Sequence, residues 1–545
     1  MLTSDSVKPV QKSSDSGLLR SSGVVSFFTM LSRFMGLARD IVFARVIGAE
    51  ALADVFFVAF KIPNFFRRLF AEGAFAQAFV PILGEYRENG SQAAVRALIN
   101  RVTGTLGITL LMLTLIIVLA SPVMAAIFAP KWFLDDPAKF AATADMLRIT
   151  FPYLLFISMT GVAGGILNSY DRFAVPAFTP LLLNVTLIAA ALVAAPLFDQ
   201  PAYALAWGVL VAGVVQLMFQ LPFLHRIHML PVPIIDWQDS GVRKILALMA
   251  PAIFGVSVSQ INLLLDTMLA TFLPTGSVSW LYYSDRLSEL PLGVFAVAIA
   301  TVILPNLSRH HAADSQQAFS QTLDWALKTV LLIALPAAVA LILLAEPILL
   351  TLFYYGDVMT ARDMSMATLS LRAYAAGLVA FMLIKVLAPG FFARQDMRTP
   401  VRIGVIAMLS NMLLNLLFVL PLHYFWQIGH VGLAAATSVS AFLNALLLFI
   451  HLRKKGIYSP TTNWLRFFLA LLMSVVVMIV ALLLVASQLQ ILNTTLWYTL
   501  LWWQRLGNIA LLCMGGFIAY SACLFACGFR LADLYGPSKA TSSKD

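Results

Sequence analysis

Charged residues are scarce in this chain. Only 11% of its 545 residues are Asp, Glu, Lys or Arg, whereas 60% are hydrophobic. Soluble globular proteins carry about 25% charged residues, so the composition excludes an ordinary soluble domain and indicates an integral membrane protein. Sustained alternation of polar and apolar residues is also missing, which excludes a transmembrane β-barrel.

Cysteine and histidine are few as well. The three cysteines, Cys513, Cys523 and Cys527, lie in one apolar stretch, and the seven histidines form no cluster with Cys or acidic residues. The sequence therefore predicts no disulfide, no metal site and no cofactor. No cleavable signal peptide is expected, because the residues before Gly23 are polar.

Long apolar runs dominate the rest of the chain. Runs of about 20 residues, the length of a membrane-spanning helix, recur about fourteen times. They begin near residues 24, 53, 101, 143, 176, 202, 244, 279, 323, 364, 399, 428, 464 and 506. The predicted fold is an all-α integral membrane protein of about fourteen transmembrane helices.

The formal net charge of +10 is concentrated in alternate connections between these helices. Basic residues near the ends of membrane helices mark the cytoplasmic side, so this is not a nucleic-acid signal. The sequence thus predicts cytoplasmic termini at both ends, in agreement with an even number of helices. The basic connections contain Arg87, Arg96, Arg101, Arg172, Arg226, Arg243, Lys244, Arg309, Arg394, Arg398, Arg402, Arg453, Lys454 and Lys455.

The chain also repeats itself. The segments NSYDRFAVP (168–176) and FARQDMRTP (392–400) each lead into an apolar helix, and each ends in a proline. At nearly the same offset, Leu205 aligns with Leu433 and Asp40 with Asp266. This near-constant offset predicts two six-helix lobes in parallel orientation, followed by two C-terminal helices. Transporters with such repeats bind their cargo between the halves.

The resulting organisation has five parts. We predict a disordered cytoplasmic N-terminus (1–23), an N-lobe (24–228), a C-lobe (244–455), two appended helices (464–531) and a cytoplasmic tail (532–545).

The first two apolar segments contain nine charged side chains, of which six are basic. An ionisable group at bilayer depth costs roughly 3 kcal/mol or more unless it faces water or a partner. The excess of basic groups predicts a wet cationic cavity for an anionic cargo. Arginine favours bidentate contacts with phosphate oxygens, which suits a phosphate or pyrophosphate head group. The nine are Arg33, Arg39, Asp40, Arg45, Asp54, Lys61, Arg67, Arg68 and Glu72.

Helical periodicity sorts these charges onto shared faces. Arg33 shares a face with Asp40, and Asp54 shares one with Lys61. A third stripe, in the eighth predicted helix, consists of Ser279, Tyr282, Tyr283, Arg286 and Glu289. The alternative is that these groups form internal salt bridges that fix helix packing, or that those near a helix end reach the interface.

A second polar set lies in the predicted C-lobe. Asp266 is an isolated acid in an apolar helix, Asn411 and Asn415 are one helical turn apart on another, and Thr437 lies on a third. One carboxylate, two amides and a hydroxyl suit a hard monovalent cation or a proton relay. Ordinary hydrogen bonding between helices is the alternative.

Four stretches resemble the MurJ (MviN) family of lipid II flippases, within the multidrug/oligosaccharidyl-lipid/polysaccharide exporter superfamily. The resemblance runs over nearly the whole chain from about residue 24. The stretches are SRFMGLARD (32–40), DVFFVAFKIPNFFRRLFAEGAFAQAFVP (54–81), GSVSWLYYSDRLSELPLGV (276–294) and VLAPGFFARQDMRTPV (386–401).

This resemblance implies a central cationic cavity and a groove beside the last two helices for a polyprenyl tail. It places essential residues at Arg33, Asp40, Asp54, Arg67 and Arg286, with Ser32, Ser279 and Glu289 near them. Lys61 joins the cavity set on its helical face.

The predicted function is alternating-access transport of lipid-linked peptidoglycan precursor from the inner to the outer leaflet of the bacterial cytoplasmic membrane. The cargo would be a polyprenyl-pyrophosphate-linked disaccharide-peptide, the partners membrane lipids, and the protein a monomer and not an enzyme. Coupling to Na⁺, H⁺ or membrane potential stays open, and so does the role of Asp266.

Two alternatives remain. The first is another polysaccharide-lipid flippase or a cation-coupled drug antiporter of the same fold. The second is a membrane-embedded transferase acting on lipid phosphates. A transferase would need clustered acids at the membrane face to hold a metal, and the sequence shows none.

Overall fold

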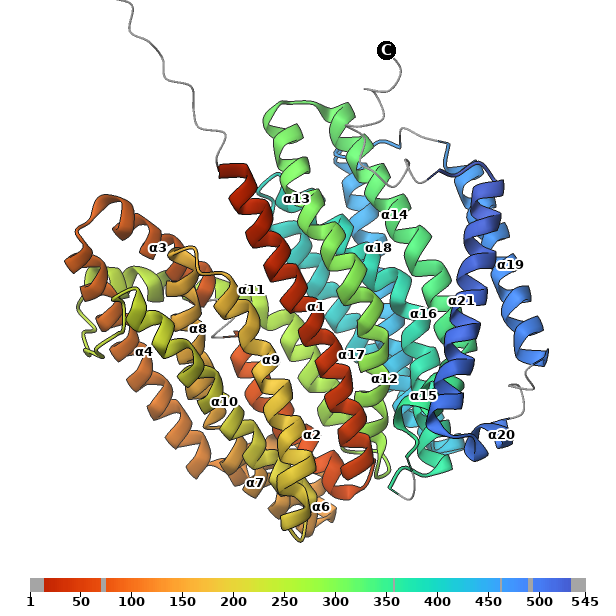
Figure 1. Cartoon of the computed structure of the whole chain (residues 1–545), viewed down its shortest axis with the longest axis horizontal. Coiled ribbons are helices and arrows are strands. Elements are labelled where there is room, and N and C mark those ends of the chain that lie inside the picture. Colours follow the sequence, from red (N-terminus) through yellow and green to blue (C-terminus); the bar gives the residue numbers. More distant parts are fainter. Residues whose placement is uncertain (1–13, 70–74, 356–357, 461–462, 489–493, 531–545) are drawn as a thin grey trace, which may run out of the picture. The chain divides into compact units, whose positions relative to one another are not determined.

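The computed structural model describes residues 14–69, 75–355, 358–460, 463–488 and 494–530. Every regular element within these ranges is a helix (Figure 1). In the first half of the chain the helices are α1 (Ser14–Val46), α2 (Ala51–Arg67), α3 (Phe75–Asn89), α4 (Gln92–Leu119), α5 (Ser121–Phe128), α6 (Pro130–Asp135), α7 (Pro137–Thr150), α8 (Tyr153–Ser169), α9 (Ala174–Ala189), η2 (Ala190–Ala194), η3 (Ala195–Leu197), α10 (Pro201–Arg226) and α11 (Ser240–Ala270). The second half contains α12 (Ser277–Pro291), η4 (Leu292–Ala296), α13 (Val297–Ala312), α14 (Gln316–Leu343), α15 (Ala345–Phe353), α16 (Ala361–Phe392), α17 (Arg398–Trp426), α18 (Gly429–Lys454), α19 (Trp464–Gln488), α20 (Thr494–Thr499) and α21 (Trp502–Ala526).

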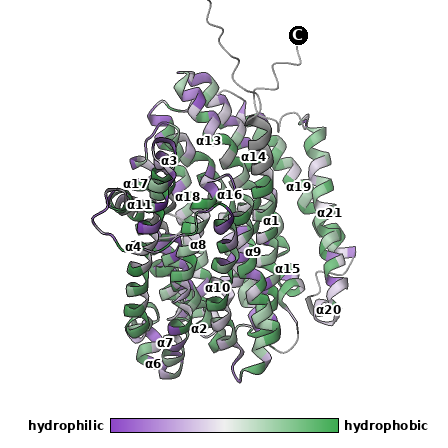
Figure 2. Cartoon of the chain, turned by 60° about the vertical axis from the view of Figure 1, so that its left-hand side comes forward, coloured by the Kyte–Doolittle hydropathy of each residue, from purple (hydrophilic) through white to green (hydrophobic). Residues whose placement is uncertain are grey.

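Eleven helical stretches in the described chain are long and apolar enough to cross a membrane. The other three of the fourteen predicted spans correspond to α1, α2 and α11, which bear the intramembrane charges noted in the sequence. Hydrophobic residues run along most of the length of the long helices (Figure 2). The prediction of an all-helical membrane protein is confirmed.

Large apolar side chains are exposed where a soluble protein would hide them. Leu469 on α19 is 60% exposed, and Phe517 on α21 is 70% exposed. In water such a surface would drive association, whereas lipid tails solvate it. The exposure therefore fits helices that face the bilayer.

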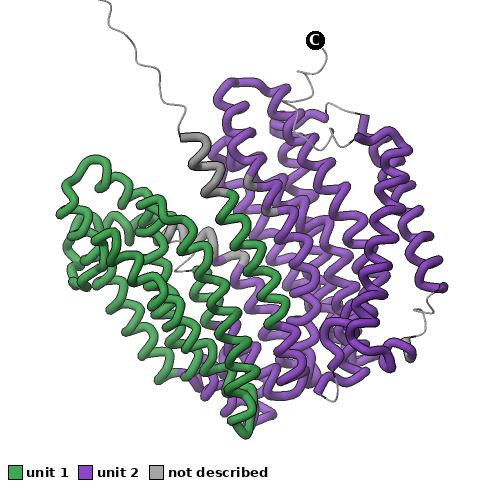
Figure 3. The backbone as a smooth tube through the Cα atoms, in the orientation of Figure 1, with its two compact units in different colours: residues 1–39, 63–120, 147–253 green, residues 40–62, 121–146, 254–545 purple. Residues whose placement is uncertain are grey.

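The chain divides into two compact units (Figure 3). Unit 1 consists of residues 1–39, 63–120 and 147–253. Its core packs side chains of α3, α4, α8 and α10, with Phe79, Leu83, Ile166 and Leu224 all fully buried. The linker that follows α10 is docked on α4, where Ile234 donates its N–H to the carbonyl of Asn100 at 3.0 Å.

Unit 2 consists of residues 40–62, 121–146 and 254–545. Its core joins α13, α14, α16 and α18 through buried apolar residues such as Leu323, Leu378 and Leu448. The beginning of α2 and the whole of α12 also belong to unit 2, so residues from both predicted lobes meet inside it. The predicted lobe boundaries at 24–228 and 244–455 stay predictions.

The internal repeat is visible in the backbone. In the turn after α8, Asp171 has φ +59° and Arg172 donates its N–H to the carbonyl of Leu167 at 2.9 Å. The turn after α16 has the same form: Gln395 has φ +59°, and Asp396 donates to Phe391 at 3.1 Å. Two turns with equivalent hydrogen bonds and a left-handed residue at the same position support the repeat inferred from the sequence.

The beginning of the chain differs from its prediction. Helix α1 begins at Ser14, inside the segment (1–23) that was predicted to be disordered. The apolar pair Leu18 and Leu19 continues the helical run, although the polar composition around it argued against a helix. Residues 1–13, Glu72 and the predicted tail (532–545) lie outside the described residues.

Candidate functional site

Asp54 holds the first turn of α12. Its carboxylate accepts the N–H of Gly276 at 2.7 Å, the N–H of Ser279 at 2.9 Å and the hydroxyl of Ser279 at 2.6 Å. The first N–H groups of a helix have no partner within the helix and carry a partial positive charge. Asp54 is only 2% exposed, so α2 supplies a buried anion that caps a helix of the second repeat.

A glycine is required at the beginning of α12. Gly276 has φ +96°, and a Cβ there would come within 2.6 Å of the Trp280 ring. A left-handed residue without a side chain lets the chain turn into the helix. The Trp280 indole is fixed in turn, because its N–H donates to Asp363 at 2.8 Å.

Two further contacts join this end of unit 2. Tyr283 donates its hydroxyl hydrogen to the carbonyl of Gly48 at 3.0 Å, and Lys139 donates to the hydroxyl of Thr275 at 2.6 Å. The turn after α1, the helix α7 and the loop before α12 are thereby tied together. Together with Asp54, these contacts join the turn after α1 and the helices α2, α7 and α12 at one end of unit 2.

Further along α12, Arg286 meets Asp40 of α1. The Arg286 Nε lies 2.8 Å from Asp40 Oδ2, and the second carboxylate oxygen accepts the Tyr282 hydroxyl at 2.9 Å. Asp40 is fully buried, whereas Arg286 is 27% exposed and also reaches Glu289 at 3.5 Å. A buried carboxylate paired with a partly accessible guanidinium is an ion pair whose cation can also reach a further anion.

The aromatic residues beside this ion pair restrict its geometry. The Tyr282 ring stacks on Phe57 of α2 with 4.0 Å between ring centroids. Because α2 and α12 come from different predicted lobes, the stacked rings and the Asp40–Arg286 pair connect the two repeats within unit 2. Lys61 lies further along the same helix, α2.

Three predicted cavity residues belong to unit 1. Ser32 accepts the side-chain amide of Asn184 through its carbonyl at 3.0 Å, and Asn184 also accepts Arg39 at 3.0 Å. Arg67 donates to Asn64 at 3.1 Å, and Arg33 is half-buried on α1. Unit 1 thus holds Ser32, Arg33 and Arg67, whereas unit 2 holds Asp40, Asp54, Lys61, Ser279, Arg286 and Glu289.

The second predicted set does come together. Asp266 Oδ1 accepts Asn415 at 2.7 Å and Asn411 at 3.1 Å, and its Oδ2 accepts the Thr437 hydroxyl at 3.2 Å. Asn262, one turn before Asp266 on α11, accepts Asn411 at 2.9 Å. Helices α11, α17 and α18 therefore present one compact group of oxygen-bearing side chains.

Two buried oxygens of this group have no hydrogen-bond partner among the described residues. They are the amide oxygens of Asn411 and Asn415, whose residues are 0% and 1% exposed. A buried polar atom left unpaired costs about 1–3 kcal/mol. The cation site stays a prediction, because the amide N–H groups that face the Asp266 carboxylate are equally the hydrogen bonds between helices that form the alternative.

Asn262, Asn184 and Gly276 are among the residues of these clusters that the sequence missed. Asn262 is one helical turn from Asp266 and could have been found by helical spacing. Asn184 is the polar residue of an apolar run, which is a weaker signal. Gly276 carries no local signal for its contact with Asp54, because that contact joins segments far apart in the chain.

Comparisons with known proteins agree with this architecture. The family model described as "Lipid II flippase MurJ" matches residues 43–501. A protein of Vibrio cholerae serotype O1, named "Probable lipid II flippase MurJ", is 50% identical over 523 residues, which are 95% of this chain and 97% of the relative. A protein of Burkholderia cenocepacia named "Lipid II flippase MurJ" is 45% identical over 459 residues, covering 83% of this chain and 87% of the relative.

Solved structures show the same fold. One described as "Lipid II flippase MurJ, inward closed conformation" has a TM-score of 0.74 and 26% identity, and covers 92% of this chain and 98% of its own. A multidrug resistance MATE family transporter in an inward-facing conformation has a TM-score of 0.63 at 15% identity, covers 79% of this chain and 97% of its own, and indicates the fold alone. The family match over most of the chain and the 50% identity to the Vibrio protein show that this chain belongs to the MurJ family of lipid II flippases.

Proposed function

We propose that this protein carries lipid II from the inner to the outer leaflet of the bacterial cytoplasmic membrane by alternating access. The observation that carries the proposal is the Asp40–Arg286 pair, which joins the two repeats at 2.8 Å in a member of this family. No bond of the cargo is made or broken, so the protein is a transporter and not an enzyme.

The chemistry of the pair suits a pyrophosphate head group. Asp40 holds Arg286 by one carboxylate oxygen while the Arg286 side chain stays 27% exposed. A pyrophosphate offers more oxygens and more charge than one carboxylate, so it competes for the planar fork of Arg286. Cargo binding would thereby weaken the link between α1 and α12 and favour a different arrangement of the repeats.

The contacts of Asp54 oppose the rearrangement that cargo binding at Arg286 favours. Three hydrogen bonds onto the first turn of α12 hold this end of unit 2 closed. In the proposed cycle the end opens when cargo at Arg286 loosens α12. We place this end toward the outer leaflet, because the basic connections predict cytoplasmic termini.

We further propose that the Asp266 group is the coupling site. Its carboxylate, the Thr437 hydroxyl and the unpaired amide oxygens of Asn411 and Asn415 suit Na⁺ or a proton. The membrane potential would act on the same steps, since one charge crossing the full field is worth about 2.3 kcal/mol per 100 mV. We propose that the protein acts as a monomer.

Asp266→Asn is expected to remove the dependence of transport on an ion gradient while lipid II still binds. The substitution keeps the shape of the side chain and removes the charge that a cation or proton needs. Lipid II translocation would be measured in proteoliposomes with imposed Na⁺ and pH gradients. Asp314→Asn, an exposed acid in the same unit, is the matched control. Equal responses to both gradients in wild type and Asp266→Asn would leave the Asp266 group with a packing role only.

The function itself is tested by depletion. Cells depleted of the protein are expected to accumulate lipid II that is inaccessible from outside, and expression of this chain should restore its exposure. Accumulation of a different polyprenyl-linked saccharide would indicate another flippase. No accumulation, together with loss of drug efflux, would indicate an antiporter and contradict the proposal.

A further inference from the structure

The two equivalent turns of the repeat differ in charge. The turn between α8 and α9 and the turn between α16 and α17 share their backbone hydrogen bonds and a left-handed residue. The ends of the neighbouring helices also agree: Met229 donates to Leu224 after α10, and Ile457 donates to Leu452 after α18, both at 3.0 Å. Because the backbone of the two turns is the same, any difference in the charge around them comes from their side chains.

In the second copy, the acid of the turn is neutralised by an ion pair with a lysine at the end of α18. Asp396 receives Lys455 at 2.8 Å and the hydroxyl of Thr399 at 2.7 Å. The hydrogen bond from Lys455, followed by that from Thr399, lowers the pKa of Asp396 to about 2. An acid and a base therefore face each other across the gap between the turn and the end of α18.

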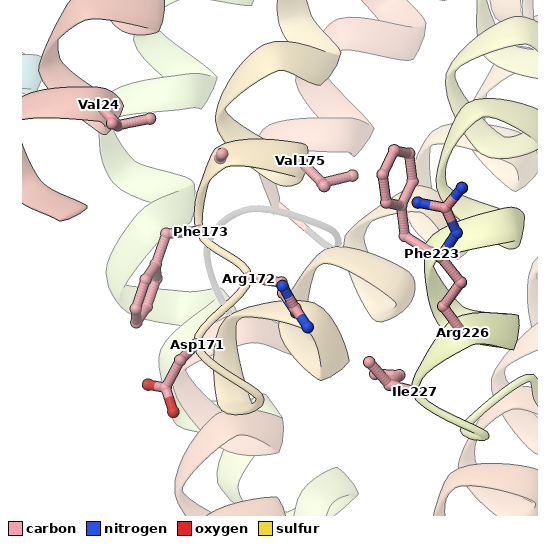
Figure 4. A pocket seen from close by; sticks show the side chains of 9 residues that line it. Val24, Asp171, Arg172, Phe173, Val175, Phe223, Arg226 and Ile227 are labelled. Carbon is pink, nitrogen blue, oxygen red and sulfur yellow. The ribbon is translucent and has the colours of Figure 1, made fainter.

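In the first copy, the turn after α8 and the end of α10 each carry an arginine. In the matching turn hydrogen bonds, Arg172 takes the place of Asp396. By the alignment of Leu205 with Leu433, Arg226 takes the place of Lys454, the neighbour of Lys455. Both arginines line one cavity (Figure 4). Within the part of the chain that the structure describes, neither guanidinium has a carboxylate at ion-pair distance; Arg226 lies over the Phe223 ring at 5.7 Å.

The acid in the cavity lining does not neutralise them. Asp171 is turned away from both guanidinium groups in Figure 4. Its side chain is 78% exposed, and its carboxylate lies 4.0 Å from Arg87, which does not line the cavity. Two like charges around a cavity, with the nearby acid directed elsewhere, produce a positive potential that favours an anion.

The cavity has room for a phosphate group and an apolar wall beside it. Its volume is about 380 Å³. Besides the arginines, the first turn of α9 lines it, and Phe173 at the N-cap of α9 makes no side-chain capping bond, so the partial positive charge of this helix end adds to the potential. The apolar part of the lining consists of Val24, Phe173, Ala174, Val175, Phe223 and Ile227.

We propose that this cavity binds the phosphate group of an anionic membrane phospholipid, with the glycerol and first acyl carbons against its apolar wall. A free phosphate would leave that wall unused, whereas a lipid at the ends of α9 and α10 reaches both parts. Arg172 and Arg226 belong to the basic connections, on the side where anionic lipid head groups attract cationic residues.

Native mass spectrometry of the purified full-length protein with added dioleoylphosphatidylglycerol tests this. In the double variant Arg172→Gln/Arg226→Gln, the affinity of the most tightly bound lipid should fall about tenfold or more, because charged hydrogen bonds to phosphate are lost. Arg172→Lys/Arg226→Lys keeps both charges and should retain most of the binding. Size-exclusion profiles check that each variant is folded.

The matched control is Arg398→Gln/Arg402→Gln, two exposed arginines at the equivalent helix of the second copy. It removes the same charge and should leave the tightest lipid bound. An equal loss in this control would reduce the effect to general electrostatics and overturn the proposal. Equal affinity for dioleoylphosphatidylcholine, or displacement of the phosphatidylglycerol by millimolar inorganic phosphate, would overturn it too.

Discussion

Arg286→Ala is expected to abolish transport while the protein still inserts and accumulates. Removing the guanidinium leaves the fully buried Asp40 carboxylate without its ion-pair partner, a loss of about 2–5 kcal/mol, and it also removes the group proposed to bind the pyrophosphate. A loss of about 10²-fold or more in lipid II translocation follows. Arg309→Ala, an exposed arginine of the same unit, should have no effect.

The geometry of the guanidinium separates two roles for Arg286. Arg286→Lys keeps the charge but loses the planar fork, so it should retain only part of the activity. The pair Asp40→Asn with Arg286→Gln restores a neutral contact between α1 and α12. If this double variant regains full transport, Arg286 serves packing alone and the cargo role is wrong. Arg33→Ala, in unit 1, carries the same expectation from the sequence.

The membrane helices and the Asp266 group could be predicted from the sequence for one reason. In an apolar membrane helix, an unpaired polar side chain costs free energy. The few polar residues are therefore easy to recognise, and they are expected to pair with one another. Asp266, Asn411, Asn415 and Thr437 were identified on that basis, and the structure places polar atoms of the other three within 3.2 Å of the Asp266 carboxylate. Asn262 completes the group by simple helical spacing.

The pairing of the charges could not be predicted. Helical faces place Arg33 beside Asp40 on one helix, but the structure pairs Asp40 with Arg286, which lies far away in sequence. Asp54 shares a face with Lys61, yet its carboxylate accepts backbone N–H groups of α12. Periodicity tells which side chains share a face of one helix, whereas packing between helices decides which partner each face meets.

The packing between α2 and α12 predicts a second large effect, that of a substitution at Asp54. Asp54→Asn is expected to loosen the first turn of α12 and to make the proposed outer end open too readily. The amide keeps one acceptor oxygen but loses the charge that faces three N–H and O–H donors. Hydrogen bonds to a charged group are worth about 1.5–3 kcal/mol each, so losing the equivalent of one shifts the ratio of open to closed protein about tenfold or more.

Ser277 reports on this opening, because it is the first residue of α12 and is fully buried. In a chain with Cys513, Cys523 and Cys527 changed to serine, Ser277→Cys would be labelled from outside with a membrane-impermeant maleimide. Labelling should be about tenfold faster with Asp54→Asn, and lipid II translocation should fall, because an end that rarely closes cannot complete the cycle. Glu50→Gln removes an exposed acid just before Asp54 and should leave both rates unchanged.

If Asp54→Asn labels no faster than Glu50→Gln, the buried carboxylate does not hold the end closed. Its contacts with α12 would then contribute to folding alone, and the closing force would have to come from Tyr283 and Lys139, whose bonds to Gly48 and Thr275 span the same end.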